Sequence, residues 1–229
     1  MNKIKTLEEI TQLFKDGQTM MIGGFLCAGT PDIFIDALLE KGIKELTIIA
    51  NDTGFPERGI GKLVMSKQIK KAIVSHVGTN KETGRQMNSG EMEVDLVPQG
   101  TLAERIRSAG VGLGGVLTPT GVGTIIEEGK QKISINGKEY LLELPLKAEI
   151  ALIQAYKADR SGNLVYRRAA RNFNPLMAMA ADLVIVAAEN IVEVGQLGPD
   201  EIVTPGTLVD IICDVQVEQA KLSGITVAI

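Results

Sequence analysis

The stretch DGQTMMIGGFLCAGTP, residues 16–31, joins a short apolar run to a loop that is rich in glycine and ends in a proline. The run is typical of a buried strand, and Pro31 favours the start of a helix directly afterwards. Gly23 and Gly24 therefore fall at the carboxyl end of a strand, where open α/β sheets bind their ligands. Two interpretations stay open: the glycines either let a ligand approach the main chain or only permit a tight turn between strand and helix.

Further buried strands alternate with helical segments along the chain, which is typical of an α/β protein. We expect an open, mostly parallel sheet with flanking helices, because parallel strands need crossover connections. A small antiparallel hairpin insert near 131–146 is predicted from an Asn-Gly pair between two alternating runs. The strands are predicted within TMMIGGF (19–25), LTIIAND (46–52), KKAIVSHVG (70–78), EVDLVPQG (93–100), AEIALIQAYKAD (148–159) and ADLVIVAAEN (181–190).

The first helix is predicted over residues 5–15, with a capping box formed by Thr6 and Glu9. A second helix begins near Pro31 and ends before Gly42, following the usual preference for proline at the start and glycine just past the end. No low-complexity linker divides the chain. We therefore predict a single domain over residues 1–229.

The composition excludes several classes of function. The net charge is −4, aromatic residues make up 3 % and there is no Trp, so a nucleic-acid binder is disfavoured. Two cysteines form no disulfide framework, and one His provides no metal site. No apolar run approaches the roughly 20 residues that span a membrane. The charged amphipathic N-terminus is unlike a secretory signal, so we expect a cytoplasmic protein, although a transit peptide removed earlier would leave no trace.

Small or polar residues follow three further predicted strands, at Asn51-Asp52, at 76–80 and at 98–107, and the carboxyl ends of parallel strands meet at one edge of a sheet. Competing motifs fit less well. The glycines of GVGLGG (110–115) follow a helix rather than a strand, and GIGKL (59–63) lacks the earlier glycine and the Ser/Thr of a P-loop. Cys27 is expected to be a small buried residue rather than a nucleophile, and His76 a structural polar residue.

Taken together, these segments resemble the alpha subunit of family I CoA-transferases. The family signature is D-G, two residues, three apolar residues, G-G-F, three residues, G, one residue and P, and residues 16–31 match it throughout. Family-like segments also include VPQGTLAERIRSAGVGLGGVLTPTGVGT (97–124) and YKADRSGNLVYRRAARNFNP (156–175), so the resemblance covers nearly the whole chain.

The resemblance implies that CoA moves between carboxylic acids by ping-pong covalent catalysis, with coenzyme A as a substrate, no tightly bound cofactor and no metal. In this family a glutamate of a Ser-Glu-Asn-Gly motif on the beta subunit is the nucleophile. Residues 187–191, AAENI, come nearest to that motif but lack its Ser and its Gly. The chain is therefore expected to be inactive until a beta subunit joins it, in an α2β2 assembly inherited from the family.

The resemblance also assigns site residues. Gln99 is expected to offer a backbone N–H to the oxyanion, as the catalytic contribution of this chain. Asn51 and Asp52 are expected near the substrate carboxylate, although a turn after the strand also explains them and Asp52 departs from members with a second Asn. The segment 166–174 fits a contact with CoA phosphates, a subunit contact or a solvated face equally well. The loop expected to contact CoA comprises Gly24, Phe25, Leu26, Cys27, Ala28, Gly29 and Thr30.

Two other functions compete with this one. A sugar-phosphate isomerase on a related α/β fold would use the same glycine loops for phosphate and would be active as an isolated chain. A ligand sensor would bind without turnover, but the chain has no basic helix-turn-helix extension. The sequence does not distinguish acetate, butyrate and acetoacetate as acyl groups, because pocket discrimination per methylene is only about 1–3 kcal/mol.

Overall fold

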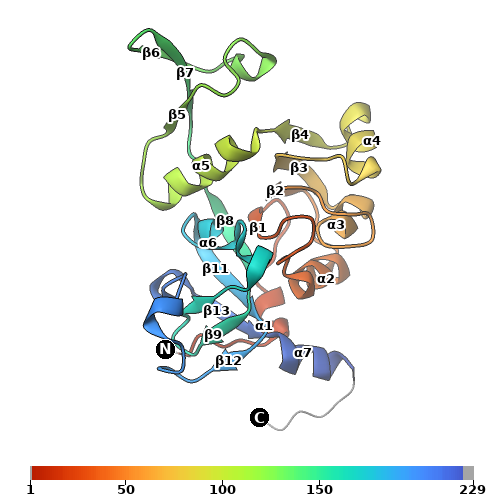
Figure 1. The fold of residues 1–229 in the computed structure, drawn as a ribbon. Coiled ribbons are helices and arrows are strands. Elements are labelled where there is room, and N and C mark those ends of the chain that lie inside the picture. Colours follow the sequence, from red (N-terminus) through yellow and green to blue (C-terminus); the bar gives the residue numbers. More distant parts are fainter. Residues whose placement is uncertain (1, 224–229) are drawn as a thin grey trace.

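The computed structural model describes residues 2–223; residue 1 and residues 224–229, which the single-domain prediction also includes, lie outside the described residues. A seven-stranded sheet forms the centre of the fold, and every neighbouring pair in it is parallel (Figure 1). The prediction of an open, mostly parallel sheet is thus confirmed. In spatial order the strands are β13 (Ile211–Asp214), β11 (Ala181–Ala188), β8 (Ala148–Ala155), β1 (Thr19–Ile22), β2 (Leu46–Ile49), β3 (Ile69–Val74) and β4 (Glu93–Leu96).

The strand order reverses at β1. The chain runs outward from β1 through β2, β3 and β4, and it then returns to the other side of β1 as β8. In open parallel sheets the connections around such a point diverge to opposite faces, which leaves a crevice at the carboxyl ends of the strands. The glycine loop that follows β1 therefore lies where the fold offers a binding site.

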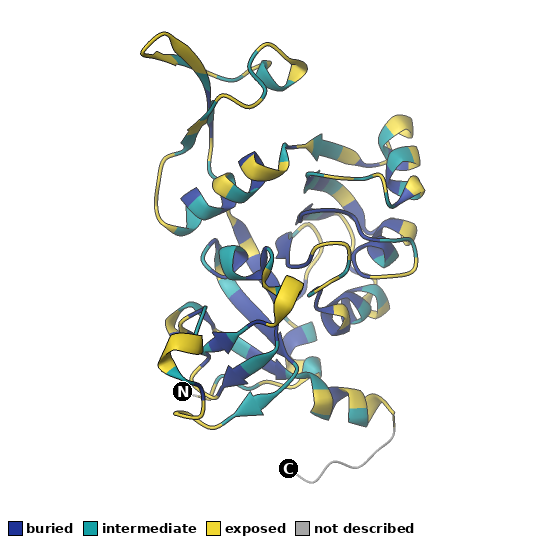
Figure 2. Ribbon diagram, in the orientation of Figure 1, coloured by how far each residue is buried: buried dark blue, intermediate teal, exposed yellow. Residues whose placement is uncertain are grey.

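Helices cover both faces of the sheet because alternate residues of each strand point to opposite sides. On β1, Met20 and Ile22 join one buried cluster and Met21 joins the other. The first cluster includes buried residues of α2 and α3, and the second includes buried residues of α5 and α6. Figure 2 shows the central strands largely buried. The α-helices are α1 (Leu7–Thr11), α2 (Asp32–Lys41), α3 (Gly61–Met65), α4 (Lys81–Ser89), α5 (Gln99–Gly110), α6 (Asn174–Met177) and α7 (Val215–Leu222).

Helix ends follow the predicted signals. The Thr6–Glu9 capping box is present, and Gly42 ends α2 in the left-handed conformation with φ +68°. The predicted helix over 5–15 is wrong in its length, because α1 ends at Thr11. The chain turns there and brings Phe14 into the core, where it is 1 % exposed.

The predicted hairpin insert is confirmed. Strands β6 (Lys132–Ile135) and β7 (Lys138–Glu143) pair antiparallel across Asn136 and Gly137, whose φ angles of +51° and +76° suit a tight two-residue turn. Strand β5 (Val116–Thr118) joins the other side of β7. This arm projects away from the central sheet beside α5, and much of it is exposed (Figures 1 and 2). A 3-10 turn, η1 (Ile125–Glu127), lies within it.

A second small sheet corrects one predicted strand. The run 148–159 was expected as one strand, but β8 ends at Ala155 and a separate strand β9 (Lys157–Asp159) begins after it. The reason is that Tyr156 N–H donates to Val165 O at 2.9 Å, so the chain leaves the central sheet at this residue. Strand β9 pairs with β10 (Leu164–Val165) and β12 (Ile191–Val192), and the remaining 3-10 turns are η2 (Arg168–Arg171), η3 (Pro199–Glu201) and η4 (Gly206–Leu208).

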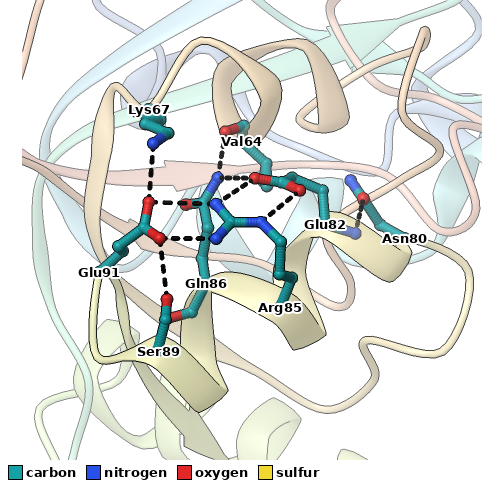
Figure 3. A network of polar contacts seen from close by, with 8 residues as sticks. All are labelled: Val64, Lys67, Asn80, Glu82, Arg85, Gln86, Ser89 and Glu91. Carbon is teal, nitrogen blue, oxygen red and sulfur yellow. Dashed lines mark hydrogen bonds and ion pairs between the residues drawn. The ribbon is translucent and has the colours of Figure 1, made fainter.

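A polar network fixes α4 against the neighbouring turn (Figure 3). Arg85 pairs with Glu82 at 2.7 Å and with Glu91 at 2.6 Å, and Lys67 pairs with Glu91 at 2.7 Å. Gln86 Nε2 donates to the Val64 carbonyl at 2.9 Å. The bonds from Arg85 and Gln86 lower the pKa of Glu82 to about 2, and the bonds from Arg85 and Lys67 lower the pKa of Glu91. No helix within residues 2–223 is long and apolar enough to cross a membrane.

Candidate active site

The loop after β1 is a tight reverse turn. Phe25 and Ala28 exchange both backbone hydrogen bonds, at 3.1 and 2.9 Å. The two residues between them, Leu26 and Cys27, have φ angles of +47° and +67°. Side-chain-bearing residues seldom adopt this region, and where they do the surrounding structure holds them there. The sequence left open a close approach of a ligand to the glycines or a tight turn; the structure has a tight turn, and its tip is built from strained non-glycine residues.

The glycines around this turn are needed because another part of the chain comes close. A Cβ on Gly23 would overlap Asn174 Oδ1, and a Cβ on Gly29 would lie 2.8 Å from Ala170 Cα. Gly29 also has φ +75°. What approaches the glycines from this side is thus the segment 170–174 of the same protein.

Two asparagines of that segment hold the turn. Asn172 Oδ1 accepts from Gly24 N–H at 3.2 Å, and Asn172 Nδ2 donates to Ala28 O at 2.9 Å. Asn174 Nδ2 donates to Gly29 O at 3.0 Å, and its Oδ1 accepts from Gln154 N–H at 3.0 Å. The sequence reasoning missed this role, because the asparagines lie more than a hundred residues after the turn in the chain.

On its other side, the turn is held by Asp52. This side chain is 5 % exposed, and its Oδ2 accepts from Leu26 N–H at 2.9 Å and from Asn51 Nδ2 at 2.8 Å. Its Oδ1 accepts from Gly54 N–H at 2.8 Å. Both carboxylate oxygens are therefore occupied by donors of the chain itself.

Asn51 and Gln99 meet, as the convergence of strand ends predicted. Gln99 Nε2 donates to Asn51 Oδ1 at 2.8 Å, and Ser75 Oγ donates to the same oxygen at 3.1 Å. These residues border a cavity of about 410 Å³ at the carboxyl edge of the sheet. Its lining comprises Phe25, Leu26, Asn51, Ser75, His76, Thr79 and Gln99.

The predicted site residues fall into two layers. Phe25, Leu26, Asn51 and Gln99 line the cavity. Behind the turn, a second and much smaller void is bordered by Gly24, Cys27, Thr30 and Asp52 among others, whereas Ala28 and Gly29 border neither space. The lining also includes His76, for which a structural role was expected, as well as Ser75 and Thr79. The polar strand ends in the sequence are the signal that leads to these residues.

Helix α5 directs its N-terminus at the same cavity. Gln99 is its first residue, and Pro98 at the N-cap provides no side-chain hydrogen bond to the first turn. The first N–H groups of a helix have no acceptor within the helix, and they carry the positive end of the helix dipole. This end of α5 is suited to an oxygen that bears negative charge.

The thiols are poor nucleophiles. Cys27 is half-buried rather than buried as expected, and desolvation raises the pKa of its thiol. Cys213 is fully buried, and burial raises its pKa to about 12.

Glu189 follows β11 and accepts from Gln154 Nε2 at 2.7 Å, outside the cavity lining. The described residues that line the cavity thus offer hydrogen-bond donors and apolar surface but no carboxylate.

The class of protein is shown by the match of the sequence to a family model. The chain belongs to the Coenzyme A transferase family, whose model matches residues 4–214. The resemblance drawn from the sequence is thereby confirmed, and the chain is an enzyme subunit of that family.

Two alpha subunits of CoA-transferases are similar to the chain over most of its length. The chain is 57 % identical over 208 residues to the acetate CoA-transferase subunit alpha of Escherichia coli, covering 91 % of this chain and 94 % of that protein. It is 56 % identical over 211 residues to the acetoacetyl-CoA:acetate/butyrate CoA transferase alpha subunit of Clostridium acetobutylicum, covering 92 % and 97 %.

A solved structure with the same fold is an acyl-CoA transferase of Escherichia coli in a thioester complex with CoA. It matches with a TM-score of 0.81 at 21 % identity, and the match covers 93 % of this chain. The present chain spans 49 % of that longer chain.

Proposed function

We propose that this chain is the alpha subunit of a heteromeric CoA-transferase that moves CoA between a short-chain acyl-CoA and a carboxylic acid such as acetate, butyrate or acetoacetate. The observation that carries the proposal is the cavity where the turn after β1, Asn51 and the N-terminus of α5 meet. The names of the two relatives support the choice of acids, since one is described for acetate and the other for acetate, butyrate and acetoacetyl-CoA.

The chemistry divides into balanced steps. A glutamate carboxylate of the partner subunit attacks the thioester carbonyl, and the C–S bond breaks, so that CoA leaves as a thiolate and an acyl-glutamyl anhydride remains. The thiolate then attacks the glutamyl carbonyl, which releases the first carboxylic acid and leaves a glutamyl-CoA thioester. The second acid reverses these steps. Covalent catalysis of this kind replaces one difficult exchange with easier ones.

The contribution of this chain is positioning and charge stabilisation. Each attack forms a tetrahedral oxyanion, and we assign the backbone N–H of Gln99 as a donor to it, aided by the dipole of α5. The loop from Gly24 to Thr30 contacts CoA, with Phe25 and Leu26 as its cavity-facing members. Asn51 faces the substrate, while Asp52 lies behind it with its oxygens already occupied.

The nucleophile is supplied in trans. The sequence contains no Ser-Glu-Asn-Gly motif, and among residues 2–223 no carboxylate lines the cavity. We therefore propose a beta subunit that carries this motif, joined to the present single-domain chain as α2β2 in the cytoplasm. CoA is a substrate of this assembly rather than a bound cofactor.

The experiment is to isolate the tagged chain from its own cells at low salt and to measure its native mass. The expected result is a stoichiometric second chain that carries Ser-Glu-Asn-Gly, with transferase activity in the complex and none in the isolated chain. A homo-oligomer that is active without a second chain would overturn the proposal and would favour an isomerase with its own acid and base.

A further inference from the structure

The turn after β1 has a counterpart after β2. Residues 24–29, Gly-Phe-Leu-Cys-Ala-Gly, correspond to residues 54–59, Gly-Phe-Pro-Glu-Arg-Gly. Each segment closes through a bridge, Phe25 with Ala28 and Phe55 with Arg58, and its flanking glycines all have positive φ. The two segments are two copies of one turn motif, placed after neighbouring strands.

The copies differ at their central residues. The second turn has Pro56 and Glu57 there, and neither has a positive φ. The first turn has Leu26 and Cys27, both in the left-handed region. The first turn therefore needs support that the second does not need, because residues with side chains leave this region unless neighbouring contacts retain them.

Asp52 connects the two copies. One of its carboxylate oxygens accepts from Leu26 N–H in the first turn, and the other accepts from Gly54 N–H at the start of the second. The Cys27 thiol lies against two glycines of the second turn. A Cβ added to Gly54 would lie 3.4 Å from Cys27 Sγ, and a Cβ added to Gly59 would lie 3.1 Å from it. The second turn, residues 54–59, thus forms the surface against which the strained first turn, residues 24–29, is fixed.

The fixed turn forms one wall of the cavity. Phe25 and Leu26 are each 40 % exposed although both are large and apolar, and both line the cavity.

The side chain at residue 52 must be a carboxylate to accept from the N–H groups of Leu26 and Gly54 at its two oxygens. An asparagine would accept at one and present an NH₂ group to the other N–H donor.

We propose that Asp52 is a positioning residue that holds the Leu26–Cys27 turn against the second turn and so sets the size of the acyl group that the cavity accepts. This inference rests on the proposed function, in which the cavity receives the acyl-CoA. Asp52 acts through Leu26 and does not touch the reacting atoms.

The test uses the complete enzyme with its partner subunit and the variant Asp52→Asn. Transfer is measured from acetyl-CoA and from butyryl-CoA to one common acceptor acid. We expect kcat/KM for the better donor to fall about tenfold, as for a lost hydrogen bond to a charged group, mainly through KM. The ratio between the two donors should move toward one, because the wall near Leu26 becomes mobile.

Asp159→Asn is the matched control. Asp159 is 2 % exposed, and both of its oxygens are also occupied by donors of the chain. Its Oδ1 accepts from the backbone N–H groups of Ser161 and Asn163 at 2.9 and 3.0 Å, and its Oδ2 accepts from Asn163 Nδ2 at 2.7 Å. It does not line the cavity. This variant should lose stability without any change in the ratio between donors.

A second readout is the alkylation rate of Cys27, followed at peptide level in the same complexes. Asp52→Asn should accelerate it and Asp159→Asn should not. An unchanged donor ratio and unchanged alkylation in an assembled Asp52→Asn enzyme overturn the inference, as does the same change in the control. Wild-type enzyme without transferase activity would instead overturn the proposed function.

If Asp52→Asn fails to assemble, the double variant with Cys27→Gly decides the question. Glycine adopts φ +67° without strain, so assembly should return if Asp52 acts by holding the strained turn. Continued failure of the double variant, while Asp159→Asn assembles, overturns the inference.

Discussion

A single added methyl group at residue 29 should distort the turn that the site depends on. Gly29 has φ +75°, and an alanine in the left-handed region costs about 1–2 kcal/mol. Its Cβ would lie 2.8 Å from Ala170 Cα and 2.9 Å from Ala170 O. Because these atoms include main chain, the clash is relieved only by moving the turn or η2, and overpacking of this kind costs about 1–3 kcal/mol more. The free energy of unfolding should fall by about 2–5 kcal/mol in total.

Gly42→Ala is the matched control for this prediction. Gly42 has φ +68° at the end of α2, and a Cβ there meets nothing within 4 Å. It should therefore carry only the backbone cost, about 1–2 kcal/mol. The assay compares thermal unfolding midpoints and kcat/KM of the complete enzyme.

Gly29→Ala should show the larger drop in midpoint together with a loss of transferase activity, whereas Gly42→Ala should keep the activity. Equal midpoints and equal activities for the two variants would refute the argument that the close approach of Ala170 positions the turn.

Two further predictions concern α5 and α4. Gln99→Pro removes the backbone N–H at a helix position that tolerates proline, whereas Gln99→Ala keeps this N–H. The value of kcat should fall about 10²–10³-fold more for the proline variant than for the alanine variant. Equal rates for the two variants would exclude the N–H as an oxyanion donor. The network at Arg85 lowers the pKa of Glu82 to about 2, so its stabilisation is present above the ordinary carboxyl pKa and is lost as the pH falls toward 2. The thermal midpoint should therefore drop more on acidification below about pH 4.5 for wild type than for Arg85→Ala, and parallel curves would contradict this.

Local sequence patterns were sufficient to predict most of the architecture. Apolar runs marked the strands of the central sheet, and Asn136-Gly137 marked the hairpin, because these signals act over a few residues. The pairing of β1 with β8 was beyond such patterns, since it joins segments far apart in the chain. The early end of α1 follows from tertiary packing of Phe14, which overrides helical periodicity.

The candidate site was predicted in outline for the same reason. Asn51 and Gln99 follow strands that end at one sheet edge, so their meeting was predictable from the alternation of elements. The hydrogen bonds from Asn172 and Asn174 to the glycine turn could not be predicted, because no local signal pairs residues so far apart in the chain. The repeat of Gly-Phe-x-x-x-Gly at 24–29 and 54–59, in contrast, is visible in the sequence, and the proposed role of Asp52 between the two turns could have been predicted from it.

The central claim is that this chain shapes the site while its partner supplies the nucleophile. The most direct measurement is to incubate the complete enzyme with acyl-CoA, digest both subunits and locate the covalent CoA adduct by mass spectrometry. The account predicts a CoA-sized mass increase on the glutamate of the partner's Ser-Glu-Asn-Gly peptide and none on this chain. A CoA adduct on a carboxylate of this chain, such as Glu189, would contradict it.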